Sequence, residues 1–176
     1  MVDQTITYLE MTSPGQLVPS RPPPEPLELE PVDAARVDLF HSTVLRIGEP
    51  HNWTTPSGRA EDQWRERLAR PDVLAWIARV GDEVAGAIEL ELHGGADVEI
   101  TMFGLMPEMV GRGFGGHLLT LATQLAWEAR LPGDPPNRRV WLHTSSLDHP
   151  HALPNYERRG FRVFRTERRP RPIEVG

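Results

Sequence analysis

One stretch of the sequence constrains the fold more than any other, because residues 98–128 combine strand, turn and helix patterns. Residues 98–105 have strand character, and residues 111–116 contain four glycines within six positions. Residues 117–128 then carry apolar side chains at helical spacing. Glycines let the backbone turn sharply and let a ligand approach bare N–H groups. The stretch therefore predicts a strand-to-helix connection with room for a ligand.

The glycine-rich turn, residues 110–116, leads into the start of a helix, where backbone N–H groups lack partners and the helix dipole is positive. Together these groups predict a cradle for an anion such as phosphate. A tight connection without a ligand is the alternative. The turn ends in Gly-Gly-His, which excludes the Gly-Lys-Ser/Thr of a P-loop, and the strand at 140–144 lacks the terminal acidic residue of a Rossmann unit.

Two motifs resemble those of the GNAT N-acetyltransferases. The run Arg-Gly-Phe-Gly-Gly-His-Leu-Leu at 112–119 is similar to the family's pyrophosphate loop for acetyl-CoA, with Gly113 and Gly115 at its two small positions. Val110 departs from the usual Gln or Arg there. The second motif, Ala-Leu-Pro-Asn-Tyr-Glu-Arg-Arg-Gly-Phe at 152–161, is similar to the family's Ala-x-x-x-Tyr-x-x-x-Gly-Phe.

The resemblance implies an α/β (α+β) GNAT fold, in which a mixed, mostly antiparallel central sheet is flanked by helices on both faces. The local patterns agree with this order of elements. Strands are predicted at 5–11, 72–80, 84–93, 98–105, 140–144 and 161–166, and helices at 33–47, 59–69, 117–128 and 149–159. In residues 84–93, Val84 and Leu92 are expected on one face of the strand and Glu89 and Glu91 on the other.

The length of 176 residues favours one domain spanning 1–176. Residues 14–31 are proline-rich, so we expect an extended surface segment without helix, either an ordinary linker or part of a dimer contact. The arginine-rich residues 168–176 are expected to form a loose tail.

The resemblance also implies which residues bind acetyl-CoA. Strand amides would pair with pantetheine, and the turn's N–H groups would hold the pyrophosphate with Arg112 adding charge. His149 would contact pantetheine, and Asn155 either contacts CoA or caps its helix. The resulting cofactor-binding set is Phe103, Leu105, Val110, Gly111, Arg112, Gly113, Phe114, Gly115, Gly116, His149 and Asn155.

Two catalytic residues follow from the same resemblance. Tyr156 matches the tyrosine that donates a proton to the departing thiolate, and a phenol can serve as that acid. Glu99, on the strand before the glycine turn, matches the catalytic glutamate of the histone-acetylating branch. A solvent-facing strand carboxylate is the alternative for Glu99. Glu89 and Glu91 are reserve bases, and His143 and His149 are alternatives that titrate near neutral pH.

Trp53, in a loop flanked by proline and glycine, is the candidate wall of the acceptor pocket, and a loop-anchoring aromatic is its alternative. Trp64 also favours an enclosed pocket, and Glu89 is assigned to substrate binding as well. His51 has no partner at ligand spacing, so no metal site is predicted.

Composition excludes several classes. There are no cysteines, and therefore no disulfide, thiolate metal site or cysteine nucleophile. The net charge of −6 argues against nucleic acid as the main partner. No apolar run reaches the roughly 18 residues of a membrane span, and no signal pattern opens the chain, so a cytoplasmic protein is expected.

Three functions compete at this point. The first is an N-acetyltransferase that uses acetyl-CoA, without a metal, to modify a small-molecule or peptide amine. The second is a protein acetyltransferase acting on lysine or an N-terminus, which would need a shallow groove. The third is a non-catalytic acyl-CoA-binding module, which could dispense with Tyr156 and Glu99. The resemblance to GNAT proteins also implies a homodimer.

Overall fold

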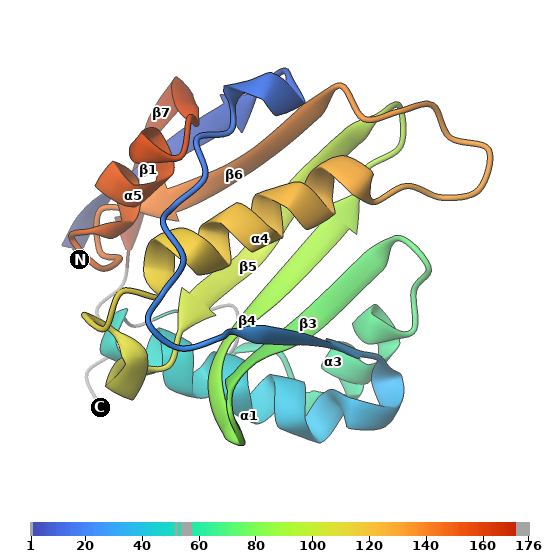
Figure 1. The fold of residues 1–176 in the computed structure, drawn as a ribbon, viewed down its shortest axis with the longest axis vertical. Coiled ribbons are helices and arrows are strands. Elements are labelled where there is room, and N and C mark those ends of the chain that lie inside the picture. Colours follow the sequence, from blue (N-terminus) through green and yellow to red (C-terminus); the bar gives the residue numbers. More distant parts are fainter. Residues whose placement is uncertain (1, 52, 54–57, 172–176) are drawn as a thin grey trace.

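A computed structural model describes residues 2–51, 53 and 58–171 of the chain. Its centre is a seven-stranded sheet in the order β2-β3-β4-β5-β6-β1-β7 (Figure 1). Neighbouring strands run antiparallel except β5 and β6, which run parallel. The strands are β1 (Val2–Met11), β2 (Glu28–Val32), β3 (Val73–Val80), β4 (Glu83–Leu92), β5 (Asp97–Leu105), β6 (Arg139–Ser145) and β7 (Arg162–Arg171).

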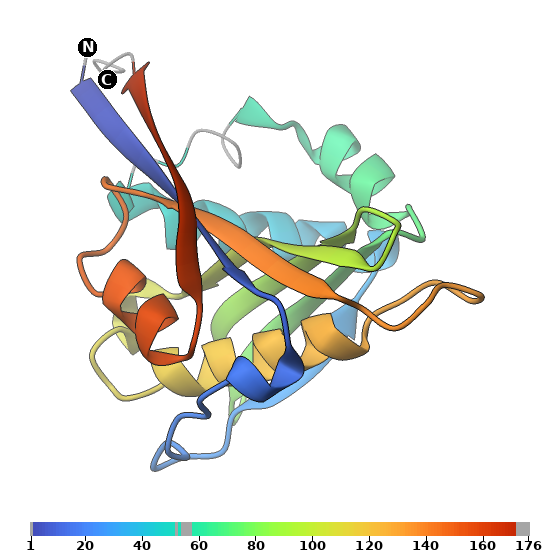
Figure 2. The same ribbon diagram turned by 90° about the horizontal axis from the view of Figure 1, so that it is seen from above.

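Helices cover both faces of this sheet. Helices α1 (Val37–Gly48) and α3 (Glu61–Leu68) lie on one face, and α4 (Gly115–Glu128) and α5 (Ala152–Arg158) lie on the other (Figure 2). Short 3-10 turns stand at Pro14–Gln16, Ala34–Arg36, Glu49–His51 and Pro107–Met109. The expected mixed, mostly antiparallel sheet between two helical layers is confirmed. None of the described helices is long and apolar enough to cross a membrane.

The core forms where the apolar stripes of the helices meet the sheet. Phe40 of α1 and Trp64 of α3 are fully buried and meet edge to face, with ring centroids 5.7 Å apart. On the other face, Leu118 and Ala122 of α4 are fully buried. Asp33 caps the turn before α1, because its carboxylate accepts a hydrogen bond from the Ala35 N–H.

The proline-rich segment is more ordered than the expected extended surface segment without helix. Residues Pro14–Gln16 form a 3-10 turn, which tolerates proline in its first position because that position needs no N–H donor. Residues Glu28–Val32 are strand β2, paired with β3 at the edge of the sheet. An edge strand accommodates Pro31, since the missing N–H can face away from the ladder.

Both ends of the described chain join the sheet. Strand β1 lies between β6 and β7, and its pairing with β7 runs from Val2 opposite Arg171 to Glu10 opposite Arg162. The expected loose tail at 168–176 is therefore wrong for residues 168–171, which belong to β7. The rest of that tail lies outside the described residues.

Strand β4 also differs from its predicted pattern of one buried and one exposed face. Ala85, Ala87, Ile88, Glu89 and Leu90 are all buried. Helix α1 and the Arg67–Glu89 ion pair of α3 cover one side of β4, and Leu118 of α4 approaches Gly86 on the other. A register shift opposite β5 between Glu89 and Leu90 also interrupts regular alternation.

Candidate active site

The site begins where strands β5 and β6 separate. Their parallel pairing consists of three residue pairs and ends at Glu99 opposite Trp141. Beyond this point β5 continues to Leu105 beside β4 alone, so along the described chain its other edge has no strand partner. Unpaired strand N–H and C=O groups can bind an extended ligand. The predicted pantetheine contacts Phe103 and Leu105 lie on this open stretch.

The glycine-rich turn follows β5 and leads into α4. Gly111 and Gly113 have φ angles of 82° and 87°, which side-chain-bearing residues rarely adopt. The helix starts at Gly115, two residues earlier than predicted, and Leu118 N–H donates to the Phe114 carbonyl oxygen at 2.9 Å. The N–H groups of Gly115 and Gly116 therefore precede the helix's own hydrogen bonds and form the kind of cradle that binds phosphate.

The proline-rich segment crosses this cradle. The Ser20 N–H donates to Thr120 Oγ1 of α4 at 3.0 Å, and Glu25 lies 3.4 Å from Arg112. A Cβ atom on Gly116 would lie 2.7 Å from Ser20 Oγ, so a side chain at this position would require Ser20 to shift. Arg112, expected at the rim of the phosphate site, is thus paired with an acidic residue of the crossing segment.

On the sheet face opposite α4, the splayed strands open into a cleft of about 460 Å³. Trp53 borders it, as predicted for a pocket wall, and its indole Nε1–H donates to Asp148 Oδ1 at 2.8 Å. Asp148 also accepts from Thr144 Oγ1 at 2.6 Å and from the Ser145 N–H at 2.9 Å. Asp148 therefore fixes the indole relative to the end of β6.

Tyr156 borders the same cleft from helix α5. It is 8% exposed, and its ring meets Phe103 of β5 edge to face at a centroid distance of 6.1 Å. Burial raises the pKa of the Tyr156 phenol, and the negative charge of Asp148 raises it further. The phenol therefore stays protonated at neutral pH and can donate a hydrogen bond or a proton.

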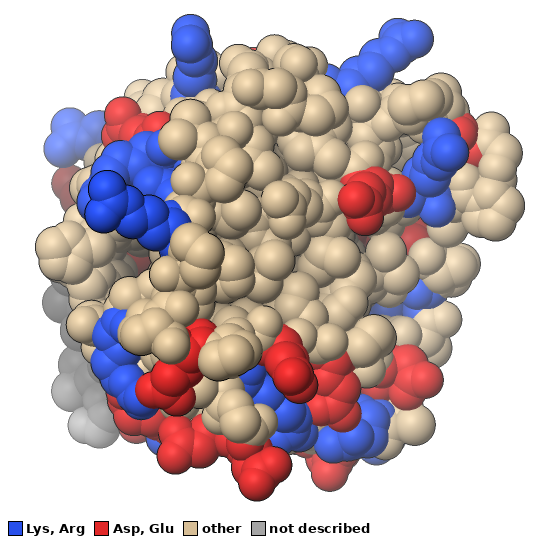
Figure 3. All heavy atoms as spheres, in the orientation of Figure 1, with Lys and Arg blue, Asp and Glu red and all other residues tan. Residues whose placement is uncertain are grey.

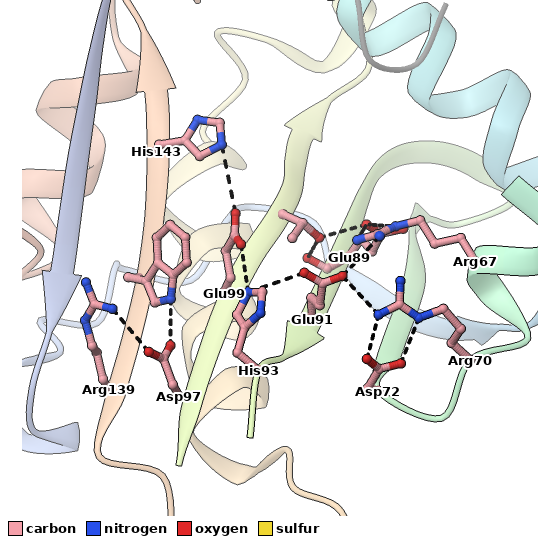
Figure 4. Close-up of polar contacts among 12 residues, drawn as sticks. Arg67, Arg70, Asp72, Glu89, Glu91, His93, Asp97, Glu99, Arg139 and His143 are labelled. Atoms are coloured by element: carbon pink, nitrogen blue, oxygen red, sulfur yellow. Dashed lines mark hydrogen bonds and ion pairs between the residues drawn. The ribbon is translucent and has the colours of Figure 1, made fainter. Parts of the chain in front are cut away.

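Glu99 turns inward and is not the solvent-facing strand carboxylate of the alternative reading. Its side chain is 12% exposed, and it borders the cleft. One carboxylate oxygen lies 2.9 Å from His93 Nε2, and the other lies 3.9 Å from His143 Nε2 (Figure 4). The carboxylate therefore stands between two imidazoles, within hydrogen-bond distance of His93 and near His143.

Glu89, assigned to substrate binding, is occupied within the protein. It is 1% exposed, its carboxylate lies 2.8 Å from Arg67 Nη2, and Thr101 Oγ1 donates to it at 2.8 Å (Figure 4). Burial lowers the pKa of Arg67, but the hydrogen bonds and charges of Glu89 and Glu91 more than offset this and raise it. Glu89 thus anchors α3 to β4 while its side chain lines the cleft, and its assignment to substrate binding stays a prediction.

His149 and Asn155, both predicted to contact CoA, lie in different surroundings. His149 precedes α5, and its ring centroid lies 6.0 Å from that of His51 and 5.1 Å from that of His151. Burial lowers the pKa of His149, and the charges of these two histidines lower it further. Asn155 faces the glycine turn, and its amide Nδ2 donates to the Gly115 carbonyl oxygen at 3.3 Å. Asn155 therefore joins α5 to the start of α4.

Trp64 does not contribute to the pocket wall that the sequence predicted. Its side chain is fully buried, because α3 turns it toward Phe40 of α1. Arg59 covers the outer side of the Trp64 ring, with the guanidinium carbon 4.5 Å from the ring centre.

One group of side chains has metal-ligand composition. Glu91, His93 and Glu99 bring possible ligand atoms within 4.8 Å of one another. These atoms are already engaged with each other, and Glu91 also lies 3.1 Å from Arg67 and 3.4 Å from Arg70. The two arginine charges would oppose a cation there, so we assign no metal to this group.

The sequence interpretation assigned no role to Asp148, Arg67, Arg59 or His93. Asp148 stands in the segment Leu-Asp-His-Pro at 147–150, beside a predicted contact, and that position was the available signal. The two arginines lie on and just before an amphipathic helix, where a solvated position is the usual outcome. The inward orientation of Arg67 depends on Glu89 and Glu91 of a distant strand, and that of Arg59 on its contact with the Trp64 ring.

Comparison with known families decides what kind of protein carries this geometry. The sequence matches the profile of the Acetyltransferase (GNAT) family over residues 40–161, more than half of the chain. The chain belongs to the GNAT family. The matched region includes the glycine-rich turn, Glu99 and Tyr156, so the two resembling motifs lie inside a GNAT domain.

Solved GNAT structures share this fold. A putative acetyltransferase of the GNAT family from Novosphingobium aromaticivorans superposes with a TM-score of 0.62 and 19% identity, covering 96% of this chain and 63% of that one. A GCN5-related N-acetyltransferase from Kribbella flavida gives a TM-score of 0.61 and 16% identity, covering 92% and 55%. An aminoglycoside acetyltransferase from an uncultured soil sample, in complex with sisomicin, gives 0.57 and 15%, covering 74% and 85%.

These identities establish the fold of the GNAT chain and nothing finer. The chain spans between about half and two thirds of the length of the first four structures it resembles. Comparison with curated proteins found no match.

Proposed function

We propose that this GNAT protein is an N-acetyltransferase that moves an acetyl group from acetyl-CoA directly to a primary amine of a small molecule or peptide. One observation carries the proposal: the edge of β5 that has no strand partner among the described residues leads from a cleft bordered by Tyr156 and Glu99 to the glycine turn that follows the strand. Groups for phosphate binding, for strand-like pairing with pantetheine and for acid–base chemistry thereby follow one another from the turn, along β5, to the cleft.

Acetyl transfer requires a neutral amine, a stabilised carbonyl oxygen and a proton for the leaving thiolate. An alkyl amine with a pKa of about 10.4 is neutral in only about 1 molecule in 2,500 at pH 7. Glu99, backed by His93 and His143, would accept the amine's proton directly or through water. A backbone N–H near Leu105 would hold the carbonyl oxygen, and Tyr156 would protonate the thiolate.

The shape of the cleft favours a small acceptor over a folded protein. Its lining comes from β5 and β6, from Trp53 beside the end of α1, from Arg59 just before α3, and from Gln4 and Arg169 on the β1–β7 ribbon. These elements bound it on several sides, whereas a protein lysine needs a shallow groove open along a surface.

Figure 3 shows that the face carrying α4 is uncharged at its centre, with acidic and basic side chains interspersed along its lower edge. That face does not offer the continuous basic stripe typical of nucleic-acid binding.

Calorimetric titration with acetyl-CoA tests the proposal, with free CoA and ATP as controls. We expect micromolar binding of acetyl-CoA, similar binding of free CoA, and weaker binding of ATP, which lacks pantetheine. Binding would be followed by a screen of amine acceptors that measures free thiol release. Absence of binding to a folded protein would refute the proposal.

The non-catalytic acyl-CoA-binding module is separated from the enzyme by the second part of this experiment. A binding module would take up acetyl-CoA and release no thiol with any amine. It would also be indifferent to substitution of Tyr156 and Glu99, because neither would act on a substrate.

A further inference from the structure

Arg59 is a cleft-lining cation that the acetyl-transfer chemistry above does not use. It borders the cleft together with Glu99 and Tyr156. Its guanidinium carbon lies 4.5 Å from the centre of the Trp64 ring, and Trp64 is itself fully buried. This cation–π contact with a buried indole limits where the guanidinium can lie.

Within residues 2–51, 53 and 58–171, no hydrogen bond or ion pair joins the Arg59 guanidinium to an acceptor. This contrasts with Arg67, whose guanidinium is engaged by both Glu89 and Glu91. Burial lowers the pKa of Arg59, the positive charge of Arg67 lowers it further, and the negative charges of Glu89 and Glu91 act in the opposite direction. A partly desolvated guanidinium that has five donors and no acceptor among the described residues is a strong receptor for an anion.

The surrounding charges limit which anion fits. Glu89, Glu91, Glu99 and Asp148 border the same cleft. A doubly charged phosphate would meet more repulsion from these carboxylates than a singly charged carboxylate would. The carboxylate geometry also matches the planar fork of a guanidinium. At another part of the cleft, Glu99 and its two histidines favour a group that gives up a proton.

We propose that Arg59 binds a carboxylate of the acceptor, so that the substrate class is a zwitterionic amine such as an amino acid or a peptide with a free C-terminus. The inference rests on the proposed acetyl transfer for the amine half of the substrate. The carboxylate half rests on Arg59 alone, which allows the two to be tested separately.

The kinetic test uses acceptors in matched pairs: glycylglycine with glycylglycinamide, and alanine with alaninamide. Amidation also changes the pKa of the amine, so the quantity compared is the carboxylate-to-amide ratio of kcat/KM in wild type and in Arg59→Gln. We expect Arg59→Gln to lower this ratio about 10-fold to 100-fold, the range expected for a lost charged hydrogen bond. Arg59→Lys should lie between the two proteins.

Arg65→Gln is the matched control, because Arg65 lies on α3 but is half exposed and paired with Glu61 and Asp62. It should leave the ratio unchanged. An equal ratio in wild type and a folded Arg59→Gln would overturn the carboxylate assignment while leaving acetyl transfer intact.

A second measurement needs neither turnover nor a variant. Phenylglyoxal modification of wild-type arginines is followed by peptide mass spectrometry, with N-acetylglycine and N-acetylglycinamide as protecting probes. We expect N-acetylglycine, but not its amide, to slow modification of Arg59, and neither to affect Arg65. Protection in a protein that binds no acetyl-CoA would refute the acetyltransferase and keep the carboxylate site. Equal modification of Arg59 with both probes would refute the carboxylate site.

Discussion

At the scale of single residues, Tyr156 combines a buried ring with a position at the cleft. We expect Tyr156→Phe to lower kcat about 10²-fold or more and to leave the dissociation constant of acetyl-CoA nearly unchanged, because only the proton donor is lost. Stopped-flow thiol release and calorimetry on the same preparation would check this. A kcat within twofold of wild type would exclude Tyr156 as the acid.

The raised pKa of Tyr156 also has a consequence for stability. The folded phenol keeps its proton above the pKa of about 10 that an unfolded tyrosine has, so its burial stabilises the fold fully below that pH. This contribution is lost as the pH rises further, because only the unfolded chain then ionises. Urea titrations at pH 8 and pH 11 should show a smaller alkaline loss of stability in Tyr156→Phe than in wild type.

Glu99 is the second residue whose role depends on a proton. Glu99→Gln should reduce kcat/KM most at low pH, where few amines are neutral, and the deficit should shrink as the pH rises toward the amine's own pKa. A pH–rate profile from pH 6 to pH 10 measures this. Glu108→Gln, at an exposed pair with Arg46, is the control. A deficit that is the same at every pH would point to a positioning role for Glu99.

At the scale of elements, the Arg67–Glu89 pair joins helix α3 to strand β4. Arg67→Ala leaves the Glu89 carboxylate buried without a counter-charge, so we expect the free energy of unfolding to fall by about 3–5 kcal/mol. Urea denaturation would measure it. Arg65→Ala, which breaks half-exposed pairs on the same helix, should cost less than about 1 kcal/mol. Similar losses in both variants would mean that Glu89 is solvated or neutral.

The glycine-rich turn and the proline-rich segment show how elements also depend on one another. The turn after β5 could be predicted because its glycines are visible in the sequence, and Gly111 and Gly113 do adopt positive φ angles. The contact of Ser20 with Gly116 and of Glu25 with Arg112 brings together residues about 90 positions apart. No periodicity encodes such a contact, so the sequence predicted only an extended surface segment, either a linker or part of a dimer contact.

At the scale of the whole molecule, strand β1 holds the sheet together because it pairs with β6 on one side and β7 on the other. Leu9 of β1 is fully buried, and Leu9→Ala should lower the free energy of unfolding by about 2–5 kcal/mol. Val163→Ala on β7 removes a side chain that is 47% exposed and should cost far less. Chemical denaturation of the two variants compares them, and equal losses would mean that β1 is not a central strand.

The sequence by itself determined the order of most elements, the glycine turn and the positions of Tyr156 and Glu99, because these depend on local periodicity, on glycine conformation and on motifs within short stretches. The tertiary structure alone decided that Glu89 is sealed by Arg67, that Trp64 enters the core, and that β1 lies between β6 and β7. It also decided that Arg59 faces the cleft with no acceptor among residues 2–51, 53 and 58–171. These outcomes depend on which distant side chains meet, and burial and charge pairing between distant segments become fixed only when the whole chain packs.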